Sequence, residues 1–306
     1  MKNSVIISSI HIKKVSVNFL CAFANLCDFA GTMGKKALKH FNETVKFLRK
    51  QYSETPTVGI VLGSGLGNFI DEIMVEKEVP YEDIPNFPVS TVEGHKGKLV
   101  FGKLSGKTVV AMAGRFHFYE GYKPHDVVFP IRIMKLLGVE TLLLSNAAGS
   151  VHPDFKVGDI MIVTDHISQF IENPLIGKNY AEFGPRFPDM SEPYKKHLIE
   201  KAKAIAALHA FDIKEGVYLS VSGPTFETKA EYKMIRALGA DVVGMSTVQE
   251  TIVANHAGMQ VCALSVVTDI GIREDDNIIT HEEVLEAARQ AEPKLAVIFK
   301  ELVAAI

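Results

Sequence analysis

The sequence predicts an α/β protein with one large domain, in which a mixed central β-sheet is covered by helices on both faces. In the second half of the chain, nearly continuous apolar segments alternate with amphipathic segments of helical periodicity. The 306 residues are 47% hydrophobic, which is enough to bury a large core. No repeat, low-complexity tract or linker divides them, so a single domain is expected.

The first half begins with a helix predicted over Lys36–Tyr52, where apolar residues recur at helical spacing between charged ones. A short β-branched strand at 57–63 runs into the glycine-rich turn GSGLG. Residues 98–113 contain two apolar runs around Ser105-Gly106, which predicts a hairpin. A helix over about 125–137 is expected to end at Gly138.

The second half alternates more regularly. Strands are predicted at 140–146, 158–165, 215–221, 241–245 and 260–268, and helices at 191–210, 228–238, 247–258 and 281–305. Thr280 and Glu283 form a capping box for the last helix. Residues 168–190 predict a long loop, a length that is unusual unless the loop is a lid or an interface.

Residues 1–33 differ from the rest of the chain because they lack sustained core periodicity. Their apolar stretches are too short to span a bilayer, and the basic pair Lys13-Lys14 lies in the middle rather than at the start, unlike a signal peptide. We therefore expect residues 1–33 to be a disordered extension, or not part of the native chain, with Met33 as the start. Residues 34–306 are then the functional domain, and export is the less favoured alternative.

Composition narrows the partners and the compartment. The formal charge of −3 arises from 33 basic and 36 acidic residues without long runs of either sign, so neither nucleic acid nor a membrane is an expected partner. Small molecules are favoured. Three cysteines are too few for a disulfide framework, and a buried Cys262 is expected, so the sequence favours a reducing cytoplasm.

Several residues that follow predicted strands suit an anion. The glycines around Ser64 allow backbone N–H groups to approach a phosphate, although a plain tight turn explains them equally well. Arg115 offers a planar fork for phosphate oxygens, and His95 and His117 can donate hydrogen bonds without a permanent charge. We expect Arg115 to be removable with little loss of stability. No set has zinc or calcium spacing, so no metal is implied.

The loop at 63–67 excludes two common alternatives. A dinucleotide fold needs G-x-G-x-x-G followed by an acidic residue, whereas the spacing here is G-x-G-x-G. A nucleophile elbow needs G-x-S-x-G, and Leu62 stands where its first glycine should be.

Later strands end in residues suited to a planar base. Phe226 and Glu227 pair a ring for stacking with an acceptor for N–H groups, although Glu227 also suits the first turn of a helix. Ser246 or Thr247 could serve only as a helix cap. For Asp269 the alternative is an exposed loop carboxylate.

Taken together, these segments resemble the trimeric purine nucleoside phosphorylases from about residue 36 to the C-terminus. The resemblance lies, in family order, in VLGSGLG (61–67), GHKGKLVFG (94–102), GRFHFYEGY (114–122), SNAAGS (145–150), FGPRFPDMS (183–191), GPTFET (223–228), GADVVGMST (239–247) and THEEVL (280–285). It implies the nucleoside phosphorylase fold and cleavage of purine nucleosides by phosphate, with no cofactor.

The resemblance also implies site residues. For phosphate they are Ser64, His95, Arg115, His117, Ser246 and the backbone at Ala147. For the ribose they are His117, Tyr119, Tyr218, Met245 and His281, which meets the 5′-hydroxyl. For the base they are Asn146, Phe226, Val243, Glu227 and Asp269. His117, Glu227 and Asp269 are the expected catalytic groups, and Phe183 is the aromatic that the family inserts into a neighbouring subunit of a homotrimer.

One residue departs from the family pattern, because Asp269 stands where enzymes acting on 6-oxopurines usually have Asn. An ionised carboxylate accepts from the 6-amino group of adenine, whereas Glu227 accepts the N1–H of 6-oxopurines. We expect inosine and guanosine as main substrates and adenosine as a secondary one. The alternatives are a methylthioadenosine phosphorylase, which His281 disfavours, and an inactive nucleoside-binding homologue, which the complete phosphate set disfavours.

Overall fold

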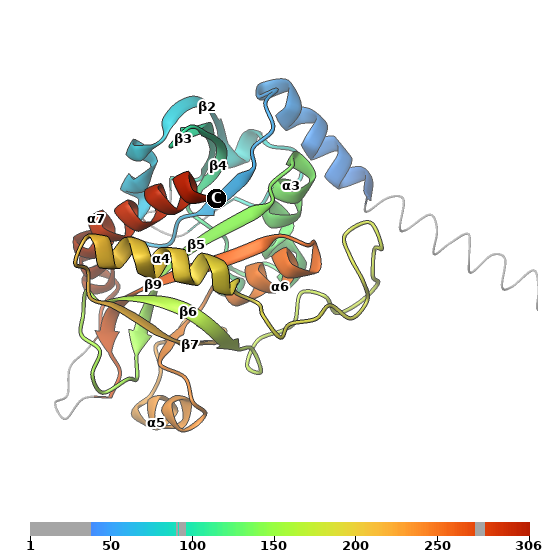
Figure 1. Cartoon of the computed structure of the whole chain (residues 1–306). Coiled ribbons are helices and arrows are strands. Elements are labelled where there is room, and N and C mark those ends of the chain that lie inside the picture. Colours follow the sequence, from blue (N-terminus) through green and yellow to red (C-terminus); the bar gives the residue numbers. More distant parts are fainter. Residues whose placement is uncertain (1–37, 90, 92–95, 273–278) are drawn as a thin grey trace, which may run out of the picture. The chain divides into compact units, whose positions relative to one another are not determined.

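The computed structural model describes residues 38–89, 91, 96–272 and 279–306 (Figure 1). The chain separates into two units, Met1–Glu43 and Thr44–Ile306. In the first unit only residues 38–43 are described, and they are helical. The predicted extension over residues 1–33 and His95 therefore lie outside the described residues.

In the second unit the described strands form one mixed nine-stranded sheet in the order β2-β3-β4-β1-β5-β8-β7-β6-β9. Their bounds are β1 Val58–Val61, β2 Met74–Pro80, β3 Lys98–Leu104, β4 Lys107–Ala113, β5 Thr141–Ser150, β6 Ile160–Ile167, β7 Ile213–Ser220, β8 Val242–Gly244 and β9 Gln260–Ile270. Because β9 also pairs with β5, the strands β5, β8, β7, β6 and β9 close into a ring.

Strand β5 connects the two parts of the sheet. Its first half, Thr141–Leu144, pairs in parallel with both β1 and β9. Its last residues, Gly149 and Ser150, pair antiparallel with Val243 and Val242 of β8. The first half of β5 therefore joins the open sheet to the closed ring, and its carboxyl end lies within the ring.

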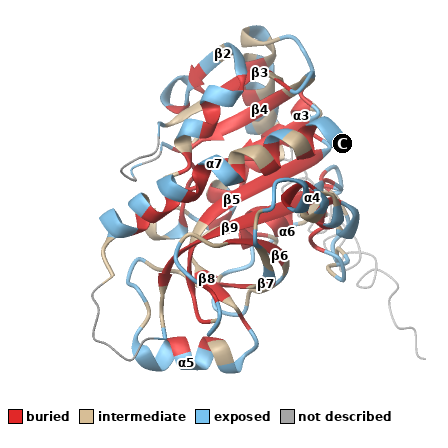
Figure 2. Ribbon diagram, turned by 60° about the vertical axis from the view of Figure 1, so that its left-hand side comes forward, coloured by how far each residue is buried: buried red, intermediate tan, exposed pale blue. Residues whose placement is uncertain are grey.

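The helices cover the sheet on both faces, as predicted. Their bounds are α2 Pro124–Val127, α3 Phe129–Leu137, α4 Lys196–Leu208, α5 Lys229–Ala237, α6 Val248–His256 and α7 His281–Ala305. Helices α4 and α7 pack on each other and on β9, and α6 packs on α3 and on β9 (Figure 1). Between these layers the central strands are almost entirely buried (Figure 2).

Local signals in the sequence are confirmed at several ends of these elements. Ser105 and Gly106, with φ of 48° and 79°, turn the β3–β4 hairpin. Gly138 ends α3 with φ of 110°. Thr280 caps α7 and exchanges hydrogen bonds with Glu283, as the capping box predicts.

Several elements differ from the prediction, among them α4, which begins at Lys196 rather than at 191. Strand β2 was not predicted, because its sequence MVEKEVP is charged and mostly exposed, as suits an edge strand. The helix expected over 125–137 is divided at Val128, since Pro130 cannot donate to the carbonyl of residue 126. Strand β5 continues to Ser150, four residues beyond the predicted end at 146, because its last residues gain a partner in β8.

Candidate active site

A cavity of about 380 Å³ lies beyond the carboxyl ends of β1, β4, β8 and β9 and along the last residues of β5. Open α/β sheets commonly bind their ligands at this edge. Of the predicted site residues, those that line it are Ser64, Arg115, His117, Tyr119, Asn146, Ala147, Phe226, Glu227, Val243, Met245, Ser246, Asp269 and His281.

Two further predicted site residues are described but do not line the cavity. Tyr218 is fully buried on β7, and its hydroxyl oxygen accepts the Ser246 N–H at 3.3 Å, so it supports the wall from behind. Phe183 is 4% exposed, with the Arg132 guanidinium carbon 4.7 Å from its ring centre.

The loop after β1 depends on its glycines. A Cβ at Gly63 would lie 2.8 Å from the Ser145 carbonyl oxygen, and one at Gly65, whose φ is 75°, would lie 2.6 Å from the Cβ of Ala288 on α7. Only glycine allows this close approach and the positive φ together. The loop that carries Ser64 is therefore fixed against both β5 and α7.

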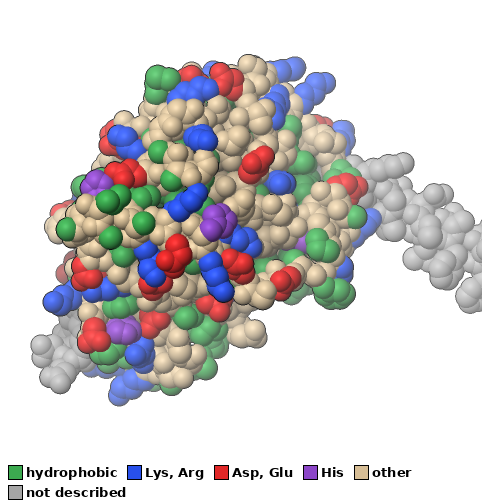
Figure 3. All heavy atoms as spheres, in the orientation of Figure 1, with side chains coloured by type: hydrophobic (Ala, Val, Ile, Leu, Met, Phe, Trp, Pro, Cys, Tyr) green, Lys and Arg blue, Asp and Glu red, His purple; other side chains and the backbone are tan. Residues whose placement is uncertain are grey.

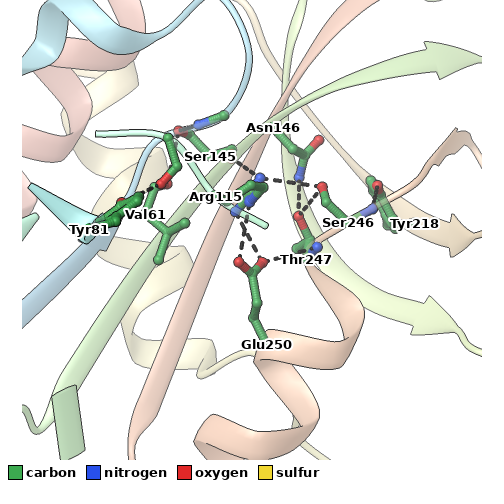
Figure 4. Close-up of polar contacts among 11 residues, drawn as sticks. Val61, Tyr81, Arg115, Ser145, Asn146, Tyr218, Ser246, Thr247 and Glu250 are labelled. Atoms are coloured by element: carbon green, nitrogen blue, oxygen red, sulfur yellow. Dashed lines mark hydrogen bonds and ion pairs between the residues drawn. The ribbon is translucent and has the colours of Figure 1, made fainter. Parts of the chain in front are cut away.

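Arg115 is the most deeply buried charged group of the site, with 1% of its side chain exposed. Its Nη1 donates to the Ser145 carbonyl at 2.6 Å and to the Ser246 hydroxyl at 3.3 Å (Figure 4). Its Nε donates to Oε1 of Glu250 at 3.2 Å, and its Nη2 lies 3.1 Å from Oε2 of the same carboxylate. Breaking a buried pair leaves one charge uncompensated, so the expectation that Arg115 can be removed with little loss of stability does not hold.

The start of α6 has an unusual backbone. Thr247 has φ of 68° and ψ of −49°, and the Val248 N–H donates to the Ser246 carbonyl at 2.7 Å, which together define a γ-turn. Such a conformation costs a non-glycine residue about 1–3 kcal/mol. Thr247 is the helix cap that the sequence allowed, while Ser246 lines the cavity.

Among the residues predicted to bind the ribose, His117 contacts both Tyr119 and Glu120. Its ring stacks on Tyr119, with centroids 4.7 Å apart, and its Nδ1 lies 3.1 Å from Oε1 of Glu120. Burial lowers the pKa of His117, although the hydrogen bond to Glu120 opposes this. Burial favours the neutral acid of Glu120, but hydrogen bonds from His117 and Thr91 lower its pKa to about 2.

These pKa shifts make His117 neutral and Glu120 ionised near pH 7. The carboxylate then holds the proton on Nδ1, so Nε2 is an acceptor. Such a ring accepts from a ribose hydroxyl or from the P–OH of hydrogen phosphate. His281 lines the same cavity from the first turn of α7.

Two carboxylates lie at the purine end of the predicted set. Burial raises the pKa of Glu227, and the nearby charge of Asp269 raises it further, while a hydrogen bond from Tyr232 lowers it. Asp269 is 5% exposed at the end of β9, so it is not the exposed loop carboxylate of the alternative interpretation. Its Oδ1 accepts the Thr268 hydroxyl at 3.1 Å.

Glycine makes room for Asp269. A Cβ at Gly149 of β5 would lie 2.6 Å from Oδ2 of this carboxylate. Phe226, in contrast, is 41% exposed at the mouth of the cavity, where a ring is available for stacking.

Sequence reasoning missed the polar residues behind the cavity, Glu250 above all. A signal was present, because Thr247 and Glu250 have the capping-box spacing that was recognised at Thr280 and Glu283.

Among the described residues there is no cluster of three or more His, Cys, Asp or Glu side chains able to hold a metal ion. Nor does any described helix combine the length and apolarity needed to cross a membrane.

The surface of the protein is mixed in charge on the face drawn in Figure 3. On this face, Lys and Arg side chains are interspersed with Asp and Glu. This agrees with the small net charge of −3.

Comparison with known proteins gives a consistent result. The chain matches the Phosphorylase superfamily over residues 57–304. It is 51% identical to Purine nucleoside phosphorylase 1 of Geobacillus stearothermophilus over 248 residues, which cover 81% of this chain and 90% of that protein. It is 46% identical to the Bos taurus purine nucleoside phosphorylase over 273 residues, covering 87% and 94% of the two chains.

Solved structures agree with the sequence comparison. The fold matches Schistosoma mansoni purine nucleoside phosphorylase in complex with adenosine with a TM-score of 0.84 and 41% identity, over 88% of this chain and 97% of that one. The match to the same kind of protein in complex with inosine has a TM-score of 0.82 and 40% identity, over 88% and 96% of the two chains.

Proposed function

We propose roles for the residues of the cavity from one premise, that the chain belongs to the purine nucleoside phosphorylase family of the phosphorylase superfamily. The protein is an enzyme, a pentosyltransferase that cleaves purine nucleosides with inorganic phosphate to give a free base and ribose 1-phosphate. Methylthioadenosine phosphorylase and an inactive binding homologue are set aside. No cofactor is required, since phosphate itself is the second substrate.

The phosphate is held, in this proposal, by Ser64, Arg115, Ser246 and the backbone N–H at Ala147. The observation that carries it is a buried guanidinium anchored beside Ser246 in the wall of a cavity that also contains the two purine-end carboxylates. The positive charge of the guanidinium and the two serine hydroxyls suit the oxygens of an anion. His95, which the family resemblance adds, lies outside the described residues.

Cleavage of the bond between C1′ and N9 builds positive charge on the sugar and negative charge on the purine. Phosphate held below the ribose stabilises the first, and it is also the nucleophile, so no covalent enzyme intermediate is needed. His117, Tyr119, Met245 and His281 orient the sugar. Attack from the face opposite the base inverts the anomeric carbon.

The base is held by Phe226, Val243 and Asn146, with Glu227 accepting the N1–H of hypoxanthine or guanine. Asp269 then determines how much adenosine is used. An ionised Asp269 accepts from a 6-amino group, whereas a protonated one donates to N7 of a departing 6-oxopurine. We propose inosine and guanosine as the main substrates and adenosine as a secondary one. Schistosoma mansoni relatives have been solved with inosine, with guanosine and with adenosine.

Assembly and location complete the proposal. We propose a homotrimer in which the segment containing Phe183 completes a neighbouring site, as the family resemblance implies. We also propose residues 34–306 as the catalytic domain and the cytoplasm as its location, the latter from the low cysteine content.

The decisive experiment measures release of hypoxanthine from inosine with and without inorganic phosphate. We expect release only with phosphate, together with ribose 1-phosphate as the α-anomer, which NMR identifies. Release of free ribose without phosphate would instead indicate a hydrolase and would contradict the proposal.

A further inference from the structure

The mechanism above leaves one buried ionisable group behind the cavity without a role. Glu250 is 3% exposed, lies in the first turn of α6 and does not line the cavity. Buried carboxylates are costly unless they are paired. Both of its oxygens contact Arg115, and Oε2 also accepts the N–H of Thr247, the residue next to Ser246.

The first engagement fixes Arg115. With Glu250 along its Nε and Nη2 edge and the Ser145 carbonyl on Nη1, the guanidinium plane is held from two sides. It cannot turn without breaking one of these contacts. The contact from Nη1 to the Ser246 hydroxyl, at 3.3 Å, therefore keeps a constant direction.

The second engagement holds the γ-turn. Oε2 of Glu250 accepts the Thr247 N–H at 3.1 Å, and the amide of Asn146 donates to the Thr247 hydroxyl at 2.9 Å. A β-branched residue does not adopt a φ of 68° unless its surroundings enforce it. These two hydrogen bonds supply that enforcement, and the turn in turn sets the position of the neighbouring Ser246.

We propose that Glu250 is a positioning residue that aligns Arg115 and Ser246 toward the same phosphate by holding the guanidinium and the Thr247 turn with one carboxylate. The inference rests on the proposed function, because it assumes that phosphate binds at these two groups. Glu250 also offsets the charge of Arg115, so the site attracts the dianion less strongly than an unpaired guanidinium would. The Arg115–Glu250 pair therefore contributes to the alignment of the phosphate rather than to its electrostatic attraction.

The test is Glu250→Gln, measured by steady-state kinetics in both substrates. We expect kcat to fall about ten- to hundredfold, the loss that corresponds to one hydrogen bond to a charged group. The KM for phosphate should stay within about threefold or decrease, because the arginine is no longer neutralised. A variant that melts earlier but keeps its kcat would overturn the proposal, since that result indicates a purely structural role.

A matched control is Glu283→Gln on α7. Glu283 forms the same type of capping box with Thr280, whose φ is an ordinary −111°, and within the part of the chain that the structure describes its carboxylate forms no ion pair with an arginine. Because glutamine also serves in a capping box, this variant should keep its kcat. An equal loss in both variants would mean that capping alone is being measured.

Double-mutant cycles give a second test, because they measure how the contacts of Glu250 with Arg115 and with the Thr247 turn depend on each other. Glycine adopts positive φ at little cost, so Thr247→Gly should reduce the damage done by Glu250→Gln in a double-mutant cycle. In an Arg115→Ala background, Glu250→Gln should cause a smaller loss than in the wild type, because only the hydrogen bond to the Thr247 N–H is left to weaken. Strictly additive effects in both cycles would refute the positioning role.

If Glu250→Gln does not fold, Glu250→Asp keeps the charge and shifts the carboxylate, and it should still lower kcat. Wild-type activity separates the two hypotheses. A wild-type protein without phosphorolysis contradicts the proposed function, whereas an active wild type with an unaffected Glu250 variant contradicts only this inference.

Discussion

The substitution Asp269→Asn tests the account of base specificity most directly. The two side chains have nearly the same shape, so the change replaces one oxygen by an amide nitrogen. The Thr268 hydroxyl donates to Oδ1 at 3.1 Å, which favours the asparagine oxygen at that place. The amide nitrogen then takes the place of Oδ2, and the residue changes from an acceptor to a donor.

The magnitude follows from the burial of this group. Asp269 is 5% exposed, so its hydrogen bonds are poorly screened by water. A hydrogen bond to a charged group contributes about 1.5–3 kcal/mol, which corresponds to about a ten- to hundredfold change. We expect the ratio of kcat/KM for adenosine to that for inosine to fall by this factor, with inosine activity unchanged or improved.

The assay measures kcat/KM for both nucleosides on the wild type and the variant. Asp165→Asn, an exposed carboxylate on β6 outside the cavity, is the control and should leave the ratio unchanged. Glu227→Gln should act in the opposite direction and reduce inosine use more than adenosine use. An adenosine-to-inosine ratio that Asp269→Asn does not alter would refute the assignment of Asp269 to the base.

Three other substitutions or conditions, and one truncation, test the rest of the site. Arg115→Ala should raise the KM for phosphate and, by leaving a buried carboxylate unpaired, lower the free energy of unfolding by about 3–5 kcal/mol; unchanged phosphate dependence would remove it from the site. Phe183→Ala should weaken nucleoside use in a trimer seen by light scattering, and a fully active monomer would contradict the assembly. Since Glu227 must be ionised to accept N1–H and burial raises its pKa, inosine kcat/KM should be full above that pKa and fall as pH decreases through it; Asp269→Asn should move this acid limb to lower pH. A chain beginning at Met33 should match the full chain in activity and melting temperature, and a misfolded product would refute the assigned boundary.

The strand ends were the most predictable part of the site. Ser64, Arg115 and Ser246 each follow a short apolar run whose composition and flanking turn residues predict a strand, and the carboxyl ends of such strands meet at one edge of a sheet. Their convergence on one cavity therefore follows from the order of the elements. The capping signals at Gly138 and Thr280 are local, and they too were predicted correctly.

Features that depend on distant partners were not predictable in this way. The extension of β5 requires β8 beside it, and the two are about a hundred residues apart in the sequence. The burial of Arg115 depends on Glu250, which sequence spacing presents only as a helix cap. Strand β2 was missed because its sequence is charged. An edge strand can be largely exposed, so it need not contain the apolar run by which the other strands were predicted.

The closed ring of β5, β8, β7, β6 and β9 affects how copies of this protein can meet. Since β9 returns to pair with β5, the end strand of the described sheet is β2, which pairs with β3 alone. That edge carries Glu76, Lys77 and Glu78, its register shifts between Val75 and Lys77, and it ends in Pro80. Such an edge resists the strand-to-strand addition that leads to aggregation and fibrils. Helix and loop surfaces are then favoured over this edge for association of the chain with itself, and they allow a closed assembly of fixed size rather than an endless sheet.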